Sequence, residues 1–174
     1  MTSIRNLTLV ALFAAATGAS ALFVIPNPFV PTVPFTLQVL AVLLSGITLG
    51  PGLALVTQIV YLLLGVAGLP VYAGGTAGLA HLLGPTGGFL LSYPLAAAVA
   101  GAVAGRKPGI ERAFTAALTG VAVIYVAGFA GLHVFAGIPL TSKAAMPLLT
   151  FLPWDLAKGA LAAIVGTRLR KALW

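Results

Sequence analysis

The chain has no cysteine and very little charge. Two of its 174 residues are acidic and nine are Lys or Arg, so charged residues make up 6% of the sequence. Soluble domains usually carry about 25% charged residues, and so few charges cannot cover a water-facing surface. The lack of cysteine excludes disulfides, thiolate metal sites and a cysteine nucleophile. With 60% hydrophobic residues, residues 1–174 are predicted to form a single transmembrane domain.

The shortage of acids and histidines argues against an enzyme. An intramembrane aspartyl protease needs two carboxylates in the membrane, but of Asp155 and Glu111 the second lies outside the apolar runs. His81 and His133 are isolated and belong to no metal-binding or Ser–His motif. The glycine-rich residues 74–88 lack the G-x-x-x-x-G-K-S/T phosphate loop. We therefore expect no catalytic residue, no metal site and no cofactor.

Six apolar segments are candidates for membrane spans, each of which needs roughly 20 residues. The predicted spans cover residues 4–25, 36–50, 51–67, 86–105, 112–136 and 146–170. The second is short, so residues 36–66 could instead form one bent element. The first, with the small-residue triplet 19–21, also has features of a cleaved signal peptide, but its apolar run is long for one, which favours a retained span.

The positions of the basic residues decide the number of spans. Six spans with Arg5 in the cytoplasm leave Lys143 as the one basic residue in an outer loop. The basic residues that then lie on the cytoplasmic side with Arg5 are Arg106, Lys107, Arg112, Arg168, Arg170 and Lys171. Five spans would put these six on the opposite side. The positive-inside rule therefore predicts an all-α polytopic membrane protein with six transmembrane helices and both termini cytoplasmic. Such basic runs beside apolar segments indicate contact with anionic headgroups, not nucleic acid.

Asp155 and Lys158 are the charged residues well inside a predicted span. Charges in a membrane are costly and usually functional, and a spacing of three puts both on one helix face. One hypothesis is a ligand site, and the other is an ion pair that joins two helices. The first is favoured, because Ser or Thr could join helices at a lower desolvation cost.

Other polar and glycine residues are weaker candidates. The stretch that contains Gly74 and Gly75 could expose backbone N–H groups to a ligand or form a tightly packed loop. Tyr72 and Tyr93 could contact a ligand or lie at the membrane interface. Gln58, in the middle of a span, needs a hydrogen-bond partner and is expected to join neighbouring helices.

Two strips of small residues have the spacing of helix contacts in lipid. Ala11, Ala15 and Ala19 form the first strip, in the first predicted span. The second strip, in the fourth span, is Ala97, Gly101 and Gly105. Each strip could dock another membrane protein or pack inside this one.

Four motifs together resemble the BioY family, the biotin-binding S components of energy-coupling factor (ECF) transporters. They are residues 34–38 (PFTLQ), 68–75 (GLPVYAGG), 84–90 (GPTGGFL) and 153–158 (PWDLAK). The resemblance covers nearly the whole chain and implies six helices with biotin bound near the outer side, in the cell membrane of a prokaryote. It also implies that the alanine strip docks on a transmembrane coupling protein that joins two ATPase subunits. A homo-oligomer remains open.

The resemblance assigns candidate roles to individual residues. Asp155 would accept from the ureido N–H groups of biotin, and Lys158 would either orient Asp155 or donate to the ligand. The remaining candidates for the polar shell are Gln38, Tyr93 and the backbone near Gly74, Gly75, Thr86 and Gly87. Aromatic cover for the apolar ring would come from Tyr72, Phe35 and Trp154. The alternatives are an S component for another vitamin and a structural membrane subunit that transports nothing.

Overall fold

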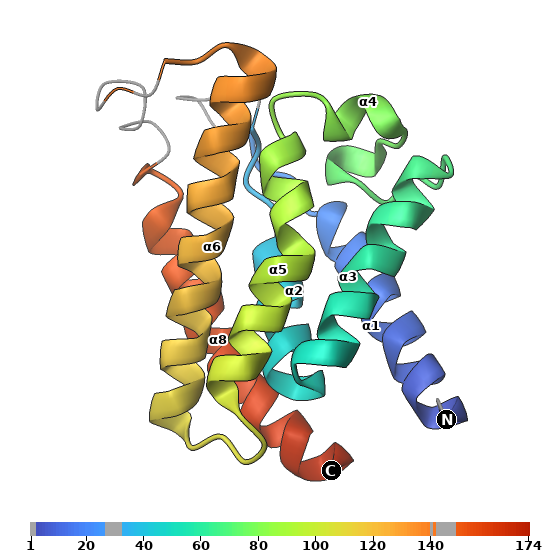
Figure 1. The fold of residues 1–174 in the computed structure, drawn as a ribbon, viewed down its shortest axis with the longest axis vertical. Helices are drawn as coiled ribbons and strands as arrows, with labels where there is room; N and C mark the ends of the chain where they lie inside the picture. Colours follow the sequence, from blue (N-terminus) through green and yellow to red (C-terminus); the bar gives the residue numbers. More distant parts are fainter. Residues whose placement is uncertain (1–2, 27–32, 140, 142–148) are drawn as a thin grey trace.

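The computed structural model describes residues 3–26, 33–139, 141 and 149–174. The described part is helical, with two isolated β-bridges and no named strand, which confirms the predicted all-α class. Lys143 and the start of the sixth predicted span lie outside the described residues. The helices are α1 (Ile4–Ala21), α2 (Gln38–Leu49), α3 (Pro51–Val66), the 3-10 turn η1 (Ala73–Gly75), α4 (Leu79–Leu82), α5 (Gly87–Ala104), α6 (Ile110–Ala136) and α8 (Leu152–Leu173) (Figure 1).

The second and third helices are separate elements joined by a tight turn. Gly50 has a φ of +81°, a value that favours glycine because it carries no Cβ. Pro51 follows at the first position of α3, where the missing N–H costs no hydrogen bond. The alternative of one bent element over residues 36–66 is therefore wrong, because the chain reverses direction at this turn (Figure 1).

Helix α2 lies at the centre of the bundle, and its side chains Val42, Leu43 and Ile47 are fully buried. It packs against α1, α3, α5, α6 and α8. Buried Gln58 of α3 donates to Ser45 of α2 at 3.1 Å and to Thr17 of α1 at 3.3 Å. The prediction that Gln58 joins neighbouring helices is confirmed.

Helices α1, α5 and α6 have the length and apolar composition to cross a membrane. Helices α2 and α3 are apolar but shorter. Helix α8 is 22 residues long, and it carries Asp155, Lys158 and three basic residues near its end. The apolar helices indicate an integral membrane protein.

Both termini lie at one end of the bundle, together with the α2–α3 and α5–α6 turns, and α4 lies at the other end (Figure 1). We call the first the basic end. There the guanidinium of Arg170 donates to the carbonyls of Ile47 at 2.9 Å and Arg106 at 3.0 Å. The guanidinium of Arg5 lies 4.2 Å from the ring centroid of Trp174. These contacts hold α8 against α2, the α5–α6 turn and the start of α1.

Candidate functional site

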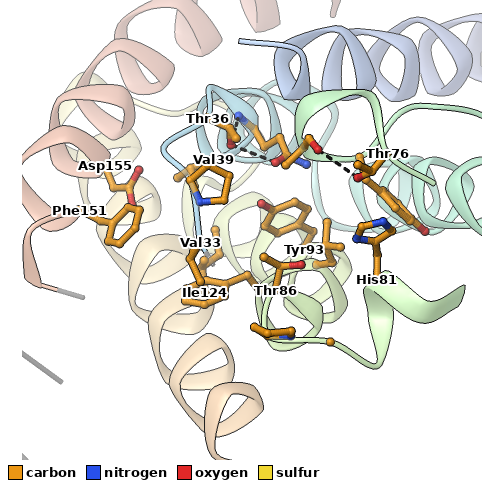
Figure 2. Close-up of a pocket in the computed structure, with 18 of the residues that line it drawn as sticks. Val33, Thr36, Val39, Thr76, His81, Thr86, Tyr93, Ile124, Phe151 and Asp155 are labelled. Carbon is orange, nitrogen blue, oxygen red and sulfur yellow. Dashed lines mark hydrogen bonds between the residues drawn. The ribbon is translucent and has the colours of Figure 1, made fainter. Parts of the chain in front are cut away.

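A cavity of about 510 Å³ opens among the helices (Figure 2). Residues of α4 form part of its wall, so it lies toward the end opposite the basic end. Its lining comes from the segment before α2, the loop after α3, α4 and the first turns of α5, together with α6 and α8. Pockets for small molecules usually have volumes of about 300–1,000 Å³. The cavity therefore has the size of a site for one small ligand, and its walls come from segments far apart in the chain.

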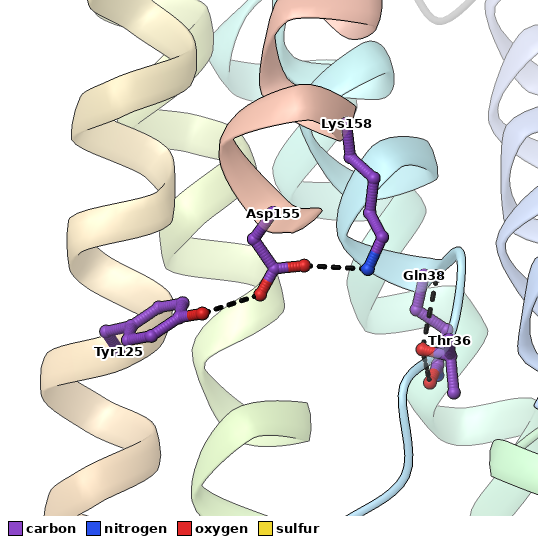
Figure 3. Close-up of polar contacts among 5 residues, drawn as sticks. All are labelled: Thr36, Gln38, Tyr125, Asp155 and Lys158. Atoms are coloured by element: carbon purple, nitrogen blue, oxygen red, sulfur yellow. Dashed lines mark hydrogen bonds and ion pairs between the residues drawn. The ribbon is translucent and has the colours of Figure 1, made fainter. Parts of the chain in front are cut away.

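The charged group of the cavity wall is a buried ion pair on α8. Asp155 is 5% exposed, and its Oδ1 accepts from Lys158 Nζ at 2.7 Å. Its other oxygen, Oδ2, accepts from the hydroxyl of Tyr125 on α6 at 2.8 Å (Figure 3). Each carboxylate oxygen has two lone pairs, so both can still accept from a ligand. The ammonium of Lys158 likewise keeps N–H groups beyond the one given to Asp155.

The side-chain amide of Gln38 is held in one orientation at the start of α2. Its Nε2 donates to the hydroxyl of buried Tyr61 at 2.6 Å. Its Oε1 accepts from the Thr36 hydroxyl at 2.9 Å (Figure 3). Gln38 and Thr36 both line the cavity. The amide therefore presents one N–H and one lone pair in fixed directions.

Three more of the predicted residues line the cavity: Tyr72, Tyr93 and Thr86. The Tyr72 hydroxyl donates to the carbonyl of Leu62 at 2.7 Å, which leaves the ring to form part of the wall. Burial raises the pKa of Tyr72, so the hydroxyl stays a neutral donor. The Tyr93 ring stacks on Tyr61, with centroids 6.4 Å apart.

The structure does not bring Gly74, Gly75 or Gly87 into the cavity wall. Both glycines of η1 have positive φ, and each faces an apolar side chain from the segment just after α1. A Cβ on Gly87 would overlap the carbonyl of Leu82, so this glycine lets α4 pack against the start of α5. The tight-loop alternative describes all three glycines better than ligand contact does.

Two predicted aromatic residues also lie outside the cavity wall. Trp154 is 64% exposed, because one position along a helix rotates the side chain by about 100° away from the face that carries Asp155. Phe35 packs against Phe151 with ring centroids 4.4 Å apart, and Phe151 is the ring that reaches the cavity. Phe35 thus supports the wall from behind.

The sequence reasoning missed Tyr125, Thr36 and the cavity role of His81. A hydroxyl in the middle of an apolar span must find a partner, and this signal could have identified Tyr125. The sequence has no comparable signal for Thr36. His81 had been noted as isolated, but α4 carries it into the cavity wall.

The two small-residue strips have opposite surroundings. Ala11, Ala15 and Ala19 are exposed along α1. In α5, by contrast, Ala97 is fully buried, and a Cβ on Gly101 would lie 2.7 Å from the backbone of the α2–α3 turn. The second strip therefore packs inside this chain, whereas the first is available to a partner.

Comparison with known proteins gives a consistent result. The model of the BioY family matches residues 1–174. The chain is 38% identical to a probable biotin transporter BioY from Pyrococcus horikoshii, covering 95% of this chain and 96% of that protein. It is 37% identical to the biotin transporter BioY from Rhizobium etli, covering 94% and 92%. The crystal structure of the S-component for biotin from an ECF-type ABC transporter superposes with a TM-score of 0.85 at 30% identity, covering 97% of this chain and 92% of the other.

Proposed function

The chain belongs to the BioY family, and we propose that its cavity is a high-affinity biotin site. The protein is an integral membrane subunit for biotin uptake and is not an enzyme. The observation that carries the proposed site is the buried pair of Asp155 and Lys158, whose free lone pairs and N–H groups line a mostly apolar cavity. The wall therefore matches a ligand that has hydrogen-bond donors and an acceptor on an otherwise apolar frame.

Biotin has that chemistry. Its ureido ring carries two N–H donors and one carbonyl, next to an apolar thioether ring. Asp155 accepts from one ureido N–H group, while Lys158 orients the carboxylate and gives a remaining N–H to the adjacent ureido carbonyl. Charge-assisted hydrogen bonds of this kind are strong when water is excluded. Gln38 and Tyr93 complete the polar shell, and Tyr72 and Phe151 cover the apolar ring.

Titration calorimetry of the purified protein tests this function. We expect saturable binding of biotin with a Kd below about 1 μM, and no heat of binding with thiamine or riboflavin at the same concentrations. Preferential binding of thiamine or riboflavin would make the chain an S component for another vitamin. The absence of binding with all three would favour a structural subunit.

We further propose six membrane spans with both termini in the cytoplasm of a prokaryotic cell. The arrangement of the basic residues supports this orientation, because Arg5, Arg106 and Arg170 share one end of the bundle, opposite α4. The positive-inside rule assigns that end to the cytoplasm, so the cavity opens outward, where biotin arrives.

The lack of native cysteine makes this orientation simple to test. Single substitutions Leu83→Cys, at an exposed position after α4, and Lys107→Cys, in the α5–α6 turn, mark the two ends. A membrane-impermeant maleimide is expected to label the first in intact cells and the second only after the cells are opened. The reverse pattern would overturn the orientation.

The partner of the uptake subunit follows from the exposed strip on α1. In this proposal Ala11, Ala15 and Ala19 lie against the transmembrane coupling protein of an ECF module, which connects the chain to two ATPase subunits. Small side chains let helix backbones approach closely in lipid, where no hydrophobic force brings helices together. A homo-oligomer would use the same kind of contact.

A further inference from the structure

The two sides of the cavity differ in charge and in position. Asp155 and Phe151 lie at one side, whereas His81 and Thr76 lie at the other, with Tyr93 between them (Figure 2). A ligand that gives an N–H group to Asp155 must extend toward the side formed by α4. A negatively charged tail also has an electrostatic reason to avoid the Asp155 carboxylate.

Among the described residues that line the cavity, His81 is the one that can carry a positive charge without already being paired with an acid. The other cation of the wall, Lys158, is already paired with Asp155 at 2.7 Å. The His81 ring is half-buried and lies against the Tyr72 ring, with centroids 6.1 Å apart. No hydrogen bond joins the imidazole to any described residue, so both ring nitrogens remain available to a ligand.

A hydroxyl and a helix end reinforce this side of the cavity. Thr86 lines the cavity and immediately precedes α5, and its side chain makes no capping hydrogen bond. Its hydroxyl can therefore donate to a ligand. The positive end of the α5 helix dipole lies at the same place and favours a negative group.

We propose that His81, as an imidazolium, binds the carboxylate of the biotin tail, with Thr86 as a second donor. This inference rests on the proposed function and adds the group that recognises the charged end of the ligand.

The two partners carry opposite charges. A carboxyl group has a pKa of roughly 4, so the tail of the ligand is ionised near neutral pH. The other ionisable groups that line the cavity are Tyr72 beside His81, Tyr93 on α5, Tyr125 on α6 and the Asp155–Lys158 pair on α8. The Tyr72 hydroxyl already donates to Leu62, and the Tyr125 hydroxyl and the Lys158 ammonium already donate to Asp155.

The test compares biotin with its methyl ester, which lacks the charge. The wild-type protein is expected to bind biotin about tenfold more tightly than the ester, the size of one charge-assisted hydrogen bond in a partly exposed site. His81→Gln should weaken biotin binding about tenfold and leave ester binding unchanged. His81→Lys should keep the preference for the acid.

The matched control is His133→Gln, because His133 lies outside the cavity wall and its Nδ1 faces the Ile138 carbonyl at 3.0 Å. This variant should behave like the wild type. If the wild type binds biotin without a preference for the acid over the ester, the role of His81 is refuted and the proposed function stands. If the wild type binds no biotin, both fail. The acid-to-ester ratio of the wild type gives a result even where a variant does not fold.

Discussion

Asp155→Asn is expected to weaken biotin binding about 100-fold or more. The carboxylate is buried in the cavity wall, and the proposed site uses a free lone pair for a ureido N–H group. An amide keeps one oxygen acceptor but replaces the other with a donor, which opposes a ligand N–H. A hydrogen bond to a charged group contributes about 1.5–3 kcal/mol, so its loss, with an amide donor facing the ligand N–H, gives an effect of this size. Calorimetry against biotin measures it.

The control for this prediction comes from the composition of the chain. Glu111 is the other acid, and it lies exposed in the first turn of α6 at the basic end. Glu111→Gln removes the same charge from the protein far from the cavity and should leave binding within about twofold. Both variants should still show a cooperative thermal unfolding transition in detergent, as the wild type does. Such a transition establishes that they are folded. Normal biotin binding by folded Asp155→Asn would mean that the ion pair joins helices and does not hold the ligand.

Ala15→Trp is expected to reduce association with the coupling module at least about tenfold while biotin binding stays unchanged. Ala15 is the middle residue of the exposed strip on α1, and an indole there would hold a partner helix away from the close contact that small residues allow. The association is measured as the amount of coupling protein that copurifies from cells that express this chain together with the coupling module. Biotin binding is measured by calorimetry.

A matched variant separates the strip from the rest of the lipid-facing surface. Ala102 is also an exposed alanine, but it lies on α5, outside the strip. Ala102→Trp adds the same bulk to the surface and should leave copurification unchanged. Equal losses from both variants would point to a general effect on membrane insertion, and no loss from Ala15→Trp would remove the strip from the docking surface.

The comparison of the two strips illustrates what spacing can and cannot predict. Ala11 and Ala15, like Ala97 and Gly101, recur every four residues, and both pairs were predicted to mark a close contact. Spacing identifies the face of a helix but not what faces it. The structure covers the strip in α5 with the α2–α3 turn and leaves the strip in α1 exposed.

The candidate site shows the same division. A spacing of three places Asp155 and Lys158 on one helix face, and the structure joins them at 2.7 Å. The third member of the cluster, Tyr125, is 30 residues away in the chain, and only the packing of α6 against α8 brings its hydroxyl to the carboxylate. Trp154 is adjacent to Asp155 in sequence but points out of the site.

The sequence was enough to predict that this protein lies in a lipid bilayer, that it is helical, and which segment carries its charged pair. These properties depend on composition and local spacing, because a chain with so few charges must use lipid and hydrogen-bond its backbone within helices. Tertiary structure alone decided which polar groups share the cavity: Gln38 held by Tyr61, Asp155 held by Tyr125, and His81 on the opposite wall. Contacts between helices depend on which face each one turns to its neighbours, and in segments that are apolar all round the residue pattern carries little information about that rotation.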